Sequence, residues 1–438
     1  MRSMPSTART TLVFGAAGLI GRYLAADLRR RGFRVVGVAR RFPTRLQADD
    51  VELPIMSMTA LELAELVKTR QADVIVNCLG ALQDGPGSNT RDVHVAFVAR
   101  LIHAVRQCGR NVRLIHLSMP GRDADDLTPF SRTKRDAERV IRSSGVRHVI
   151  LRPGFVIAAT AFGGSALMRA LAALPFALGK RETSVPFAPV AIEDIAETVA
   201  TIVDDSSIAG DAATWELMQQ EPATLGDVVA CFREVLGGPK PRIALPSLLL
   251  TAGARLGDVA SWLGWSPPIR STALAELRRG VQGDPAEWIA ATGVAPRSLA
   301  DLAARPATIQ DKWFARLYLI KAVIIVTLVI FWVVSGLIAL TASFDAAAAI
   351  LSAHGFPRAL VGPATAASSL MDIAIGIAIA FRRVCRAGLI AGIAASLFYM
   401  VGAAVLTPDL WLEPTGALVK TFPAVVLMLV ALLMLDNR

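Results

Sequence analysis

The stretch Thr11-Leu-Val-Phe14 followed by Gly15-Ala-Ala-Gly18-Leu-Ile-Gly21 decides the fold of the first part of this chain. The apolar run is typical of a buried strand, and the glycines stand where a helix would begin. Gly15 permits a tight turn, Gly18 lets the backbone approach a pyrophosphate, and Gly21 lets the helix pack closely on the strand. The first N–H groups of that helix, from Leu19 and Ile20 onward, favour phosphate. The stretch therefore predicts a dinucleotide-binding turn.

Strands and helices alternate outward from this turn. The apolar patterns predict further strands over residues 34–38, 73–77, 112–117 and 148–151, and helices over 19–31, 61–68, 93–108 and 131–143. Such alternation predicts βαβ units and an α/β fold, a Rossmann-type doubly wound parallel sheet covered by helices on both faces. Beyond Gly154, stretches rich in Pro and Gly separate short helices. We interpret residues 155–310 as a small substrate lobe of one domain, 1–310.

The second expected strand ends in Val38-Ala39-Arg40-Arg41. An NAD site usually places Asp or Glu at this point, where the carboxylate binds the ribose 2′-hydroxyl. Arginines suit the 2′-phosphate of NADP, because a guanidinium forms charge-assisted hydrogen bonds with phosphate. Arg40 and Arg41 therefore favour NADP as the cofactor, with NAD as the alternative.

Charge density falls sharply in the last part of the chain. Of the 123 residues from Arg316 onward, 13 are charged, against 69 of the 315 residues before them. Four apolar runs in this part are each near the 20 residues that cross a bilayer as a helix. We therefore expect an all-α transmembrane domain over residues 311–438, with four spans at about 316–341, 360–381, 387–406 and 417–435.

Basic residues between the expected spans predict the orientation. Arg382, Arg383 and Arg386 cluster between the second and third spans, whereas the loop between the first and second carries only Arg358. Because Lys and Arg gather on the cytosolic side of membrane proteins, four spans place both termini and this cluster in the cytosol. The segment 1–10 lacks the apolar core of a signal peptide. We expect a multi-pass protein of the inner (plasma) membrane whose first domain is cytosolic.

Cysteine spacing and charge argue against other classes of protein. The chain has four cysteines and no CxxC pair, so we expect no metal site and no disulfide scaffold. The net charge is +10, but the basic residues are scattered along amphipathic stretches without interleaved aromatic residues. This pattern favours a membrane surface over nucleic acid as a partner. The sequence predicts no oligomeric state.

Three segments resemble the short-chain dehydrogenase/reductase superfamily, in its extended and atypical branch of NAD-dependent epimerase/dehydratase-like and NmrA-like proteins. The glycine turn has that branch's GxxGxxG spacing, Asn77-Cys-Leu-Gly80 is similar to its cofactor loop, and Leu151-Arg152-Pro153 is similar to its signature beside the nicotinamide. The resemblance implies cofactor contacts from Asn77, Gly80, Arg152 and Pro153. The last part of the chain resembles DoxX-like four-helix membrane proteins.

The family's chemistry normally requires Tyr-x-x-x-Lys on a helix, and the matching segment here is Phe130-Ser-Arg-Thr-Lys134. The resemblance implies that Lys134 holds the cofactor ribose. A phenyl ring cannot exchange a proton, so Phe130 removes the usual acid–base group. Ser118, at the end of an expected strand, is interpreted either as a hydrogen-bond donor to the substrate or as a strand cap.

Other ionisable residues have plainer interpretations. We interpret the histidines of the first domain as structural: His94, His103 and His116. The acidic loop before Phe130 is interpreted as solvated rather than as a proton relay: Asp123, Asp125 and Asp126.

Asp372 lies near the middle of the second expected span. A carboxyl group there is costly unless it is neutral or paired, and such groups are often functional. Its candidate partners are Lys321, Lys420 and Tyr399. A structural hydrogen bond between helices is the alternative to a functional role.

Two functions fit these features. The first is a membrane-anchored NAD(P)-dependent oxidoreductase acting on a small molecule that is lipophilic or quinone-like. The second is a catalytically weak cofactor-binding module that senses nucleotide state or stabilises a membrane complex. Sugar epimerisation is a third and weaker hypothesis, because it also normally needs the tyrosine that Phe130 replaces.

Overall fold

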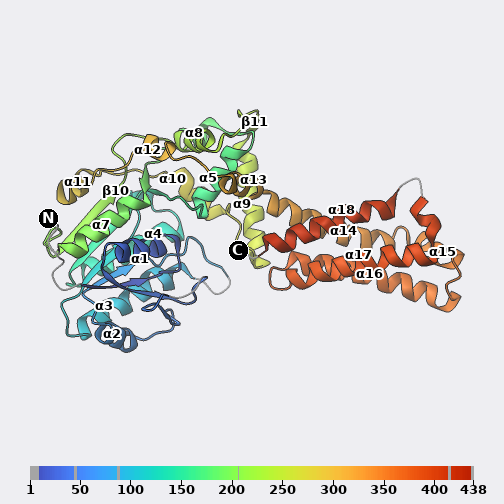
Figure 1. Ribbon diagram of the computed structural model, residues 1–438, viewed down its shortest axis with the longest axis horizontal. Coiled ribbons are helices and arrows are strands. Elements are labelled where there is room, and N and C mark those ends of the chain that lie inside the picture. Colours follow the sequence, from blue (N-terminus) through green and yellow to red (C-terminus); the bar gives the residue numbers. More distant parts are fainter. Residues whose placement is uncertain (1–8, 44–46, 86–88, 206, 413–415, 436–438) are drawn as a thin grey trace. The chain divides into compact units, whose positions relative to one another are not determined.

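A computed structural model of the chain describes residues 9–43, 47–85, 89–205, 207–412 and 416–435 (Figure 1). The chain divides into two compact units. The first contains the residues up to Leu256 together with Pro268–Ala315, and the second contains Gly257–Pro267 together with Arg316–Arg438. The expected boundary after residue 310 therefore lies near the observed one. The segment Gly257–Pro267 was expected in the substrate lobe, but it packs with the helical unit.

A seven-stranded parallel sheet forms the centre of the first unit, with strand order β10-β6-β5-β4-β1-β2-β3. Its strands are β1 Thr10–Phe14, β2 Arg34–Ala39, β3 Val51–Glu52, β4 Val74–Asn77, β5 Arg113–Leu117, β6 His148–Pro153 and β10 Ala212–Leu217. The order reverses between β1 and β4, and doubly wound sheets bind ligands at the carboxyl ends of the strands at such a point. The predicted Rossmann-type fold is confirmed.

Helices cover both faces of this sheet. Alternate residues of β1 point to opposite faces, so Leu12 and Phe14 enter one core and Val13 enters the other. Three helices lie on the Leu12 face: α2 Ala60–Thr69, α3 Phe97–Gln107 and α4 Pro129–Arg142. On the Val13 face lie α1 Leu19–Arg30 and α7 Ile192–Asp204, and Trp288 of α11 Ala286–Thr292 enters the same core. A π-helical turn, η1 Asp92–Ala96, leads into α3.

The expected substrate lobe contributes to both parts of the first unit. Its α7 and β10 complete the Rossmann layers, so the lobe proper is smaller than residues 155–310. Two small parallel sheets pair β7 Phe155–Ile157 with β9 Pro189–Ala191, and β8 Phe176–Leu178 with β11 Ile243–Leu245. The other helices are α5 Gly163–Ala173, α6 Lys180–Thr183, α8 Leu225–Leu236, α9 Ser247–Trp262, α10 Ser271–Arg279, α12 Leu299–Ala303 and α13 Ile309–Leu317.

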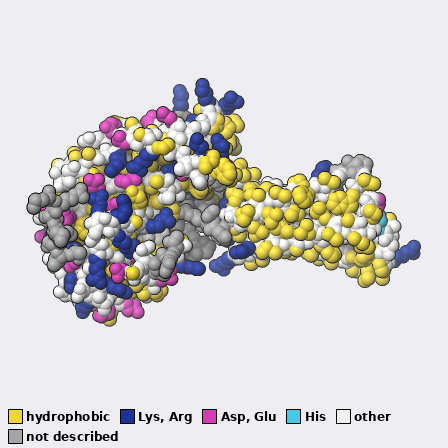
Figure 2. Space-filling model, in the orientation of Figure 1, with side chains coloured by type: hydrophobic (Ala, Val, Ile, Leu, Met, Phe, Trp, Pro, Cys, Tyr) yellow, Lys and Arg dark blue, Asp and Glu magenta, His cyan; other side chains and the backbone are white. Residues whose placement is uncertain are grey.

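Apolar helices form the second unit, and hydrophobic side chains cover the face that Figure 2 shows. Among the described residues, three helices are long and apolar enough to cross a membrane: α14 Ile320–Leu340, α16 Arg358–Ala380 and α17 Cys385–Leu406. The fourth expected span corresponds to α18 Ala417–Met434, which is shorter. The sequence did not predict the short apolar helix α15 Phe344–Ala353 between the first two long helices.

Glycines let the long helices approach closely. A Cβ atom on Gly336 of α14 would lie 2.6 Å from the carbonyl oxygen of Ser369 in α16. A Cβ atom on Gly376 of α16 would lie 2.9 Å from the backbone nitrogen of Val333 in α14. Small residues at such contacts are typical of helices that pack inside a membrane, where van der Waals contact drives association.

Candidate cofactor and active site

The glycine turn connects β1 to α1 and has the geometry that its sequence predicts. Gly15 has φ +80°, and a Cβ atom there would lie 3.1 Å from the carbonyl carbon of Cys78. A Cβ atom on Gly21 would overlap the carbonyl oxygen of Gly15. The turn therefore requires glycine at both positions, once for its backbone conformation and once for space.

The start of α1 leaves backbone donors available. Gly18 is the N-cap residue and provides no side-chain hydrogen bond. The next backbone N–H groups, from Leu19, Ile20 and Gly21, lie in the first turn, where a helix has no internal acceptors for them. Such a helix start can bind a pyrophosphate through its N–H groups and its dipole.

Lys134 lies at the carboxyl ends of β4 and β5. Its ammonium donates to the carbonyl oxygens of Leu117 at 2.8 Å and Leu79 at 3.3 Å, and the residue is only 5% exposed. A Cβ atom on Gly80 would lie 3.6 Å from Lys134 Nζ. Burial lowers the pKa of Lys134 to about 8. An ammonium has three N–H donors, so one remains beyond these two carbonyl partners.

His94 of η1 fixes the loop beside Lys134. Its Nε2 accepts the backbone N–H of Ala81 at 3.1 Å, so its Nδ1 carries the proton and donates to Thr133 Oγ1 at 2.8 Å. Burial and the nearby Lys134 ammonium lower the pKa of His94 to about 2, which keeps the ring neutral. Both ring nitrogens are occupied, so the geometry supports the structural interpretation of this histidine.

Phe130 occupies the position of the missing phenol. Its ring packs edge-on against the His94 ring, with the centroids 5.7 Å apart. Phe130 and Lys134 both project from α4, four residues apart, so they lie on one side of the helix. Lys134, which we expect to bind the cofactor, and the position of the expected phenol therefore lie together, but Phe130 provides no proton-transfer group.

Ser118 and Asn77 mark the ends of β5 and β4. The Asn77 side chain donates from Nδ2 to His116 Nδ1 at 3.1 Å and accepts the backbone N–H of Leu79 at 3.1 Å. Asn77 therefore fixes the start of the loop that follows β4. Ser118 Oγ is buried beside Glu138, and its hydroxyl helps to lower the pKa of that carboxylate.

Glu138 is the centre of a buried ion-pair network that the sequence did not predict. Its carboxylate is fully buried. Arg152 donates to it at 2.9 and 2.6 Å, Arg142 at 2.9 Å and Arg135 at 3.3 Å. These partners, Arg152 first among them, lower the pKa of Glu138 to about 2 against the opposing effect of burial. The sequence offered one signal for this network, a carboxylate four residues after Lys134. The arginines that pair with Glu138 are spread along the sequence.

This network also decides where the Arg152 side chain lies, whereas strand pairing positions Pro153. The Arg152 guanidinium bonds Glu138 and, at 3.3 Å, Glu216 of β10. Pro153 is buried at the end of β6, paired with Leu217. The structure thus places Arg152 in ion pairs with protein groups, and its cofactor contact remains a prediction.

The acidic loop before Phe130 is more ordered than we expected. Asp126 is buried and accepts from Arg135 at 2.9 Å and from Arg279 of α10 at 2.8 Å. Asp123 pairs with Arg135 at 3.0 Å. The interpretation as a solvated loop is therefore wrong for Asp126, which ties the loop to α10.

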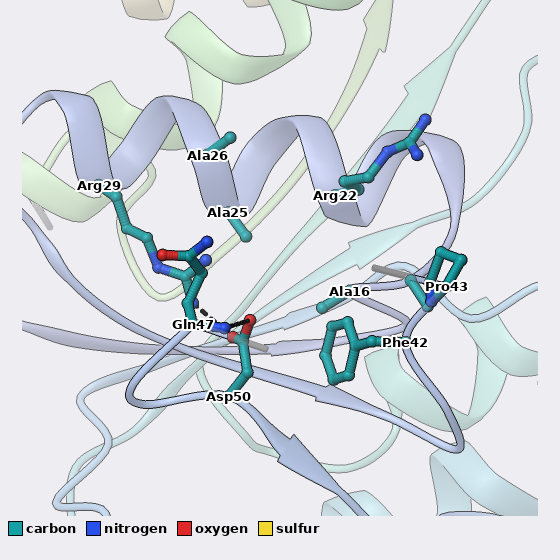
Figure 3. A pocket seen from close by; sticks show the side chains of 10 residues that line it. Ala16, Arg22, Ala25, Ala26, Arg29, Phe42, Pro43, Gln47 and Asp50 are labelled. Atoms are coloured by element: carbon teal, nitrogen blue, oxygen red, sulfur yellow. Dashed lines mark hydrogen bonds and ion pairs between the residues drawn. The ribbon is translucent and has the colours of Figure 1, made fainter. Parts of the chain in front are cut away.

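Arg40 and Arg41 follow β2 and are both exposed. A neighbouring pocket of about 320 Å³ opens beside the glycine turn, with Ala16, Arg22 and Phe42 on its wall (Figure 3). Asp50 closes one side of this pocket, where it pairs with Arg29 and accepts the backbone N–H of Gly37 at 2.9 Å. The Asp50 carboxylate is thus already paired with a cation and a backbone N–H. It therefore repels an incoming phosphate less than an unpaired carboxylate would.

In the second unit, Asp372 of α16 accepts a hydrogen bond from Tyr399 of α17 at 3.1 Å. Tyr399 was one of the three candidate partners. The contact joins two of the long apolar helices, so it supports the structural alternative.

Comparison with known proteins gives two family matches. Residues 11–174 match the NAD dependent epimerase/dehydratase family, and residues 329–429 match the DoxX-like family. The mitochondrial 40 kDa subunit of NADH-ubiquinone oxidoreductase from Neurospora crassa is 26% identical over 261 residues, which cover 58% of this chain and 67% of that protein. Sterol demethylase protein B from Methylococcus capsulatus is 26% identical over 327 residues, covering 66% of this chain and 94% of that protein.

Solved structures share the fold of the first unit. MoeE5 in complex with UDP-glucose and NAD is 20% identical, with a TM-score of 0.51, and the match covers 71% of this chain and 99% of that one. The Bordetella bronchiseptica enzyme WbmH in complex with NAD+ is 15% identical, with a TM-score of 0.51, over 71% of this chain and 98% of that one. At these identities the likeness establishes the fold alone.

Proposed function

Because this chain joins a domain of the NAD-dependent epimerase/dehydratase family to a DoxX-like domain, we propose that it is a membrane-anchored oxidoreductase that uses NADP(H). The observation that carries the proposal is the buried Lys134 ammonium, which lies beside Gly80 with two backbone carbonyl partners. Burying a charged group is costly unless it is paired. Among the described residues, no carboxylate forms a hydrogen bond with the Lys134 ammonium. Its remaining N–H is suited to a ribose hydroxyl.

The residues present fit a nicotinamide dinucleotide. Leu19, Ile20 and Gly21 would hold the pyrophosphate at the start of α1, and Lys134 would hold a ribose. Arg40 and Arg41 would bind the 2′-phosphate that distinguishes NADP from NAD. The nicotinamide supplies or accepts the hydride when bound, and the chain supplies its orientation and the exclusion of water.

Phe130 narrows the class of substrate. Reduction of an isolated carbonyl produces a strongly basic alkoxide and benefits from a positioned acid, which a phenyl ring cannot provide. A quinone spreads the added charge over a conjugated ring, so its reduction depends less on such an acid. Ser118 is the hydroxyl that we assign to hydrogen-bond a substrate oxygen, because it directly follows β5 at the carboxyl edge of the sheet.

Apolar side chains in the loops of this sheet edge support a lipophilic substrate. Leu82 follows β4 and Leu127 follows β5; they are 40% and 73% exposed. The carboxyl ends of parallel strands share one edge of a sheet, where ligands bind. The similarity to sterol demethylase protein B agrees with this proposal. The nucleotide sugar named with MoeE5 does not, because epimerisation of sugars also needs the missing tyrosine.

We further propose that four helices cross the inner membrane and that the first unit is cytosolic. The arginines between α16 and α17 support this orientation by the positive-inside rule. A reporter fused after Arg438 should then be cytosolic, and one inserted after Leu410, between α17 and α18, should be external. Two cytosolic signals would show that α18 does not cross the membrane.

The cofactor-binding module without turnover remains the second candidate function, and Phe130 favours it. A curated relative named as a subunit of NADH-ubiquinone oxidoreductase agrees with it. The deciding experiment is NADPH oxidation by the full chain in nanodiscs, assayed with a panel of quinones and carbonyls. We expect quinone-dependent oxidation that Ser118→Ala slows. Tight NADPH binding without oxidation by any acceptor would leave the binding module as the function.

A further inference from the structure

The segment Gly257–Pro267 is part of the helical unit, although about 50 residues of chain separate it from α14. Trp265 Nε1 donates to the carbonyl oxygen of Ala380 at 2.7 Å. The backbone N–H of Arg382 donates to the carbonyl oxygen of Leu263 at 2.9 Å. The Arg382 guanidinium lies over the Trp265 ring, 5.6 Å from its centroid. The segment is therefore fixed to the turn between α16 and α17.

This turn lies at one end of the bundle. α16 ends at Ala380, α17 begins at Cys385, and Arg382 Nη2 also donates to the carbonyl oxygen of Leu435 at 2.7 Å, just beyond the end of α18. Three apolar helices thus begin or end at the same level. Where these helices leave a bilayer, this level coincides with the lipid headgroups.

The large apolar and the charged side chains that are exposed around the turn form two groups. Four are large and apolar: Val259 (55% exposed), Trp262 (82%), Phe381 (45%) and Val384 (48%). Two are basic, Arg383 and Arg386, and both are exposed. Neither arginine forms an ion pair with any residue that the structure describes. We call these six residues the interfacial cluster.

Apolar and basic groups together match the boundary layer of a membrane. Tryptophan is enriched there because its ring is largely apolar and its N–H is polar. Arginines next to membrane helices attract anionic headgroups, and they gather on the cytosolic side. Trp262 of α9 is more than four-fifths exposed, and its helix ends in a segment already fixed to the bundle. The cluster therefore continues the apolar surface of the bundle rather than forming a separate patch.

We propose that the interfacial cluster lies in the headgroup layer of the cytosolic leaflet, where Val259 and Trp262 contact acyl chains and Arg383 and Arg386 bind the phosphates of anionic lipids. This inference rests on the proposed membrane crossing of α16 and α17. It adds a lipid-binding site on a segment far from them in sequence, and it gives α9 a membrane contact.

Spin labels on the full chain in nanodiscs test the position of the cluster. Trp262→Cys and Val259→Cys would each carry a nitroxide, and its accessibility to oxygen and to an aqueous nickel complex would be measured. Phe398→Cys, on an exposed side chain in the middle of α17, is the lipid control, and Glu65→Cys, on the surface of α2, is the aqueous control. The unsubstituted protein gives the background from its four native cysteines.

We expect the ratio of oxygen to nickel accessibility at both cluster positions to exceed that at Glu65→Cys several-fold. A ratio equal to that of Glu65→Cys would overturn the proposal. Protection from both reagents would also overturn it, because protein rather than lipid would then cover the cluster. A lipid-like ratio at Phe398→Cys in those cases would leave the membrane crossing intact, so failure of the two proposals is distinguishable.

Lipid binding tests the arginines separately. Short-chain phosphatidylglycerol would be titrated onto the detergent-solubilised full chain, with bound lipid counted by native mass spectrometry. Arg383→Gln and Arg386→Gln should each weaken the apparent affinity about fivefold. Arg358→Gln, an exposed arginine at the start of α16, is the matched control and should change little. Unchanged phosphatidylglycerol binding in the double variant, or equal competition by inorganic phosphate, would overturn the lipid site.

Discussion

The two sides of the candidate active site differ in how they are built. On the cofactor side, backbone geometry provides most of the site: the turn at Gly15, the start of α1 and the loop at Gly80. On the side where a proton would move, single side chains decide, and there Phe130 replaces the expected phenol while Arg152 is engaged by Glu138. Under the proposed function, cofactor binding and proton transfer depend on separate residues, so a chain can keep one without the other.

The same contrast appears within α4. Lys134 and Glu138 lie one helical turn apart and both are buried. Glu138 is matched by three arginines, whereas Lys134 has only backbone carbonyls as hydrogen-bond partners in the described residues. The Glu138 carboxylate therefore stabilises the fold through its ion pairs, whereas the Lys134 ammonium can still bind a ligand. Four variants test how stability and cofactor binding are divided among these residues.

Glu138→Gln should have the largest effect, on stability. Removing one member of a buried ion-pair network leaves the other charges unpaired, which costs about 3–5 kcal/mol in the free energy of unfolding. Urea unfolding of the full chain in nanodiscs, followed by circular dichroism, would measure it. Glu65→Gln on the surface of α2 is the control and should stay within about 0.5 kcal/mol.

The network also predicts a pH dependence. The pKa of Glu138 is about 2 in the folded chain and near its ordinary value of 4.5 in the unfolded chain. A lowered folded pKa contributes stability above the unfolded pKa, and this contribution is lost as pH falls from about 4.5 to about 2. Glu138→Gln should flatten this part of the stability profile. An unchanged profile would show that other carboxylates dominate it.

Replacing Arg40 with Asp and Arg41 with Ala should remove the preference for NADP. Charge-assisted contacts with phosphate contribute about 1.5–3 kcal/mol, so NADPH affinity should fall about 10- to 150-fold while NADH affinity changes little. Calorimetric titration of both cofactors would measure the change. Equal affinities for NADPH and NADH in the unsubstituted protein would remove the basis of the prediction.

Lys134→Ala should weaken either cofactor about tenfold, because one charge-assisted hydrogen bond contributes about 1.5 kcal/mol. The affinity of the unsubstituted protein should also decline above pH 8, where Lys134 loses its proton, since its pKa is about 8. Lys68→Ala on the surface of α2 is the control. Undiminished binding by Lys134→Ala would mean that the segment from Phe130 to Lys134 is not the family's motif.

Phe130→Tyr should change cofactor affinity least, by less than about threefold, or about 0.65 kcal/mol. The new hydroxyl lies on the side of the site where we expect proton transfer, not ribose binding. The same titrations would measure it beside the parent. Carbonyl reduction gained by this variant would show that the phenol was the missing component, and a loss of affinity comparable to that of Lys134→Ala would contradict the division between the two sides.

The local features of the first unit were predictable from sequence, because the glycine turn and the strand–helix alternation depend on near neighbours. β3 was not, since two residues, Val51–Glu52, carry too little pattern. The Glu138 network was also not predictable, because its partners come from α4, β6 and, through Asp126, α10. In the second unit, the length of the apolar runs predicted the long helices. The hydrogen bond between Asp372 and Tyr399 was only one of three pairings that the sequence offered. Contacts between residues that are far apart in the sequence can be identified only from the folded structure.

The attachment of Gly257–Pro267 to the turn at Arg382 has a consequence for dissecting this protein. A truncation after residue 310, where the sequence suggests a boundary, would keep Trp262 and Trp265 while deleting the helices that hold Trp265. The shortened product would carry an orphaned apolar segment and would tend to aggregate. To obtain a soluble, non-aggregating fragment, the truncation should be combined with polar substitutions of Trp262 and Trp265.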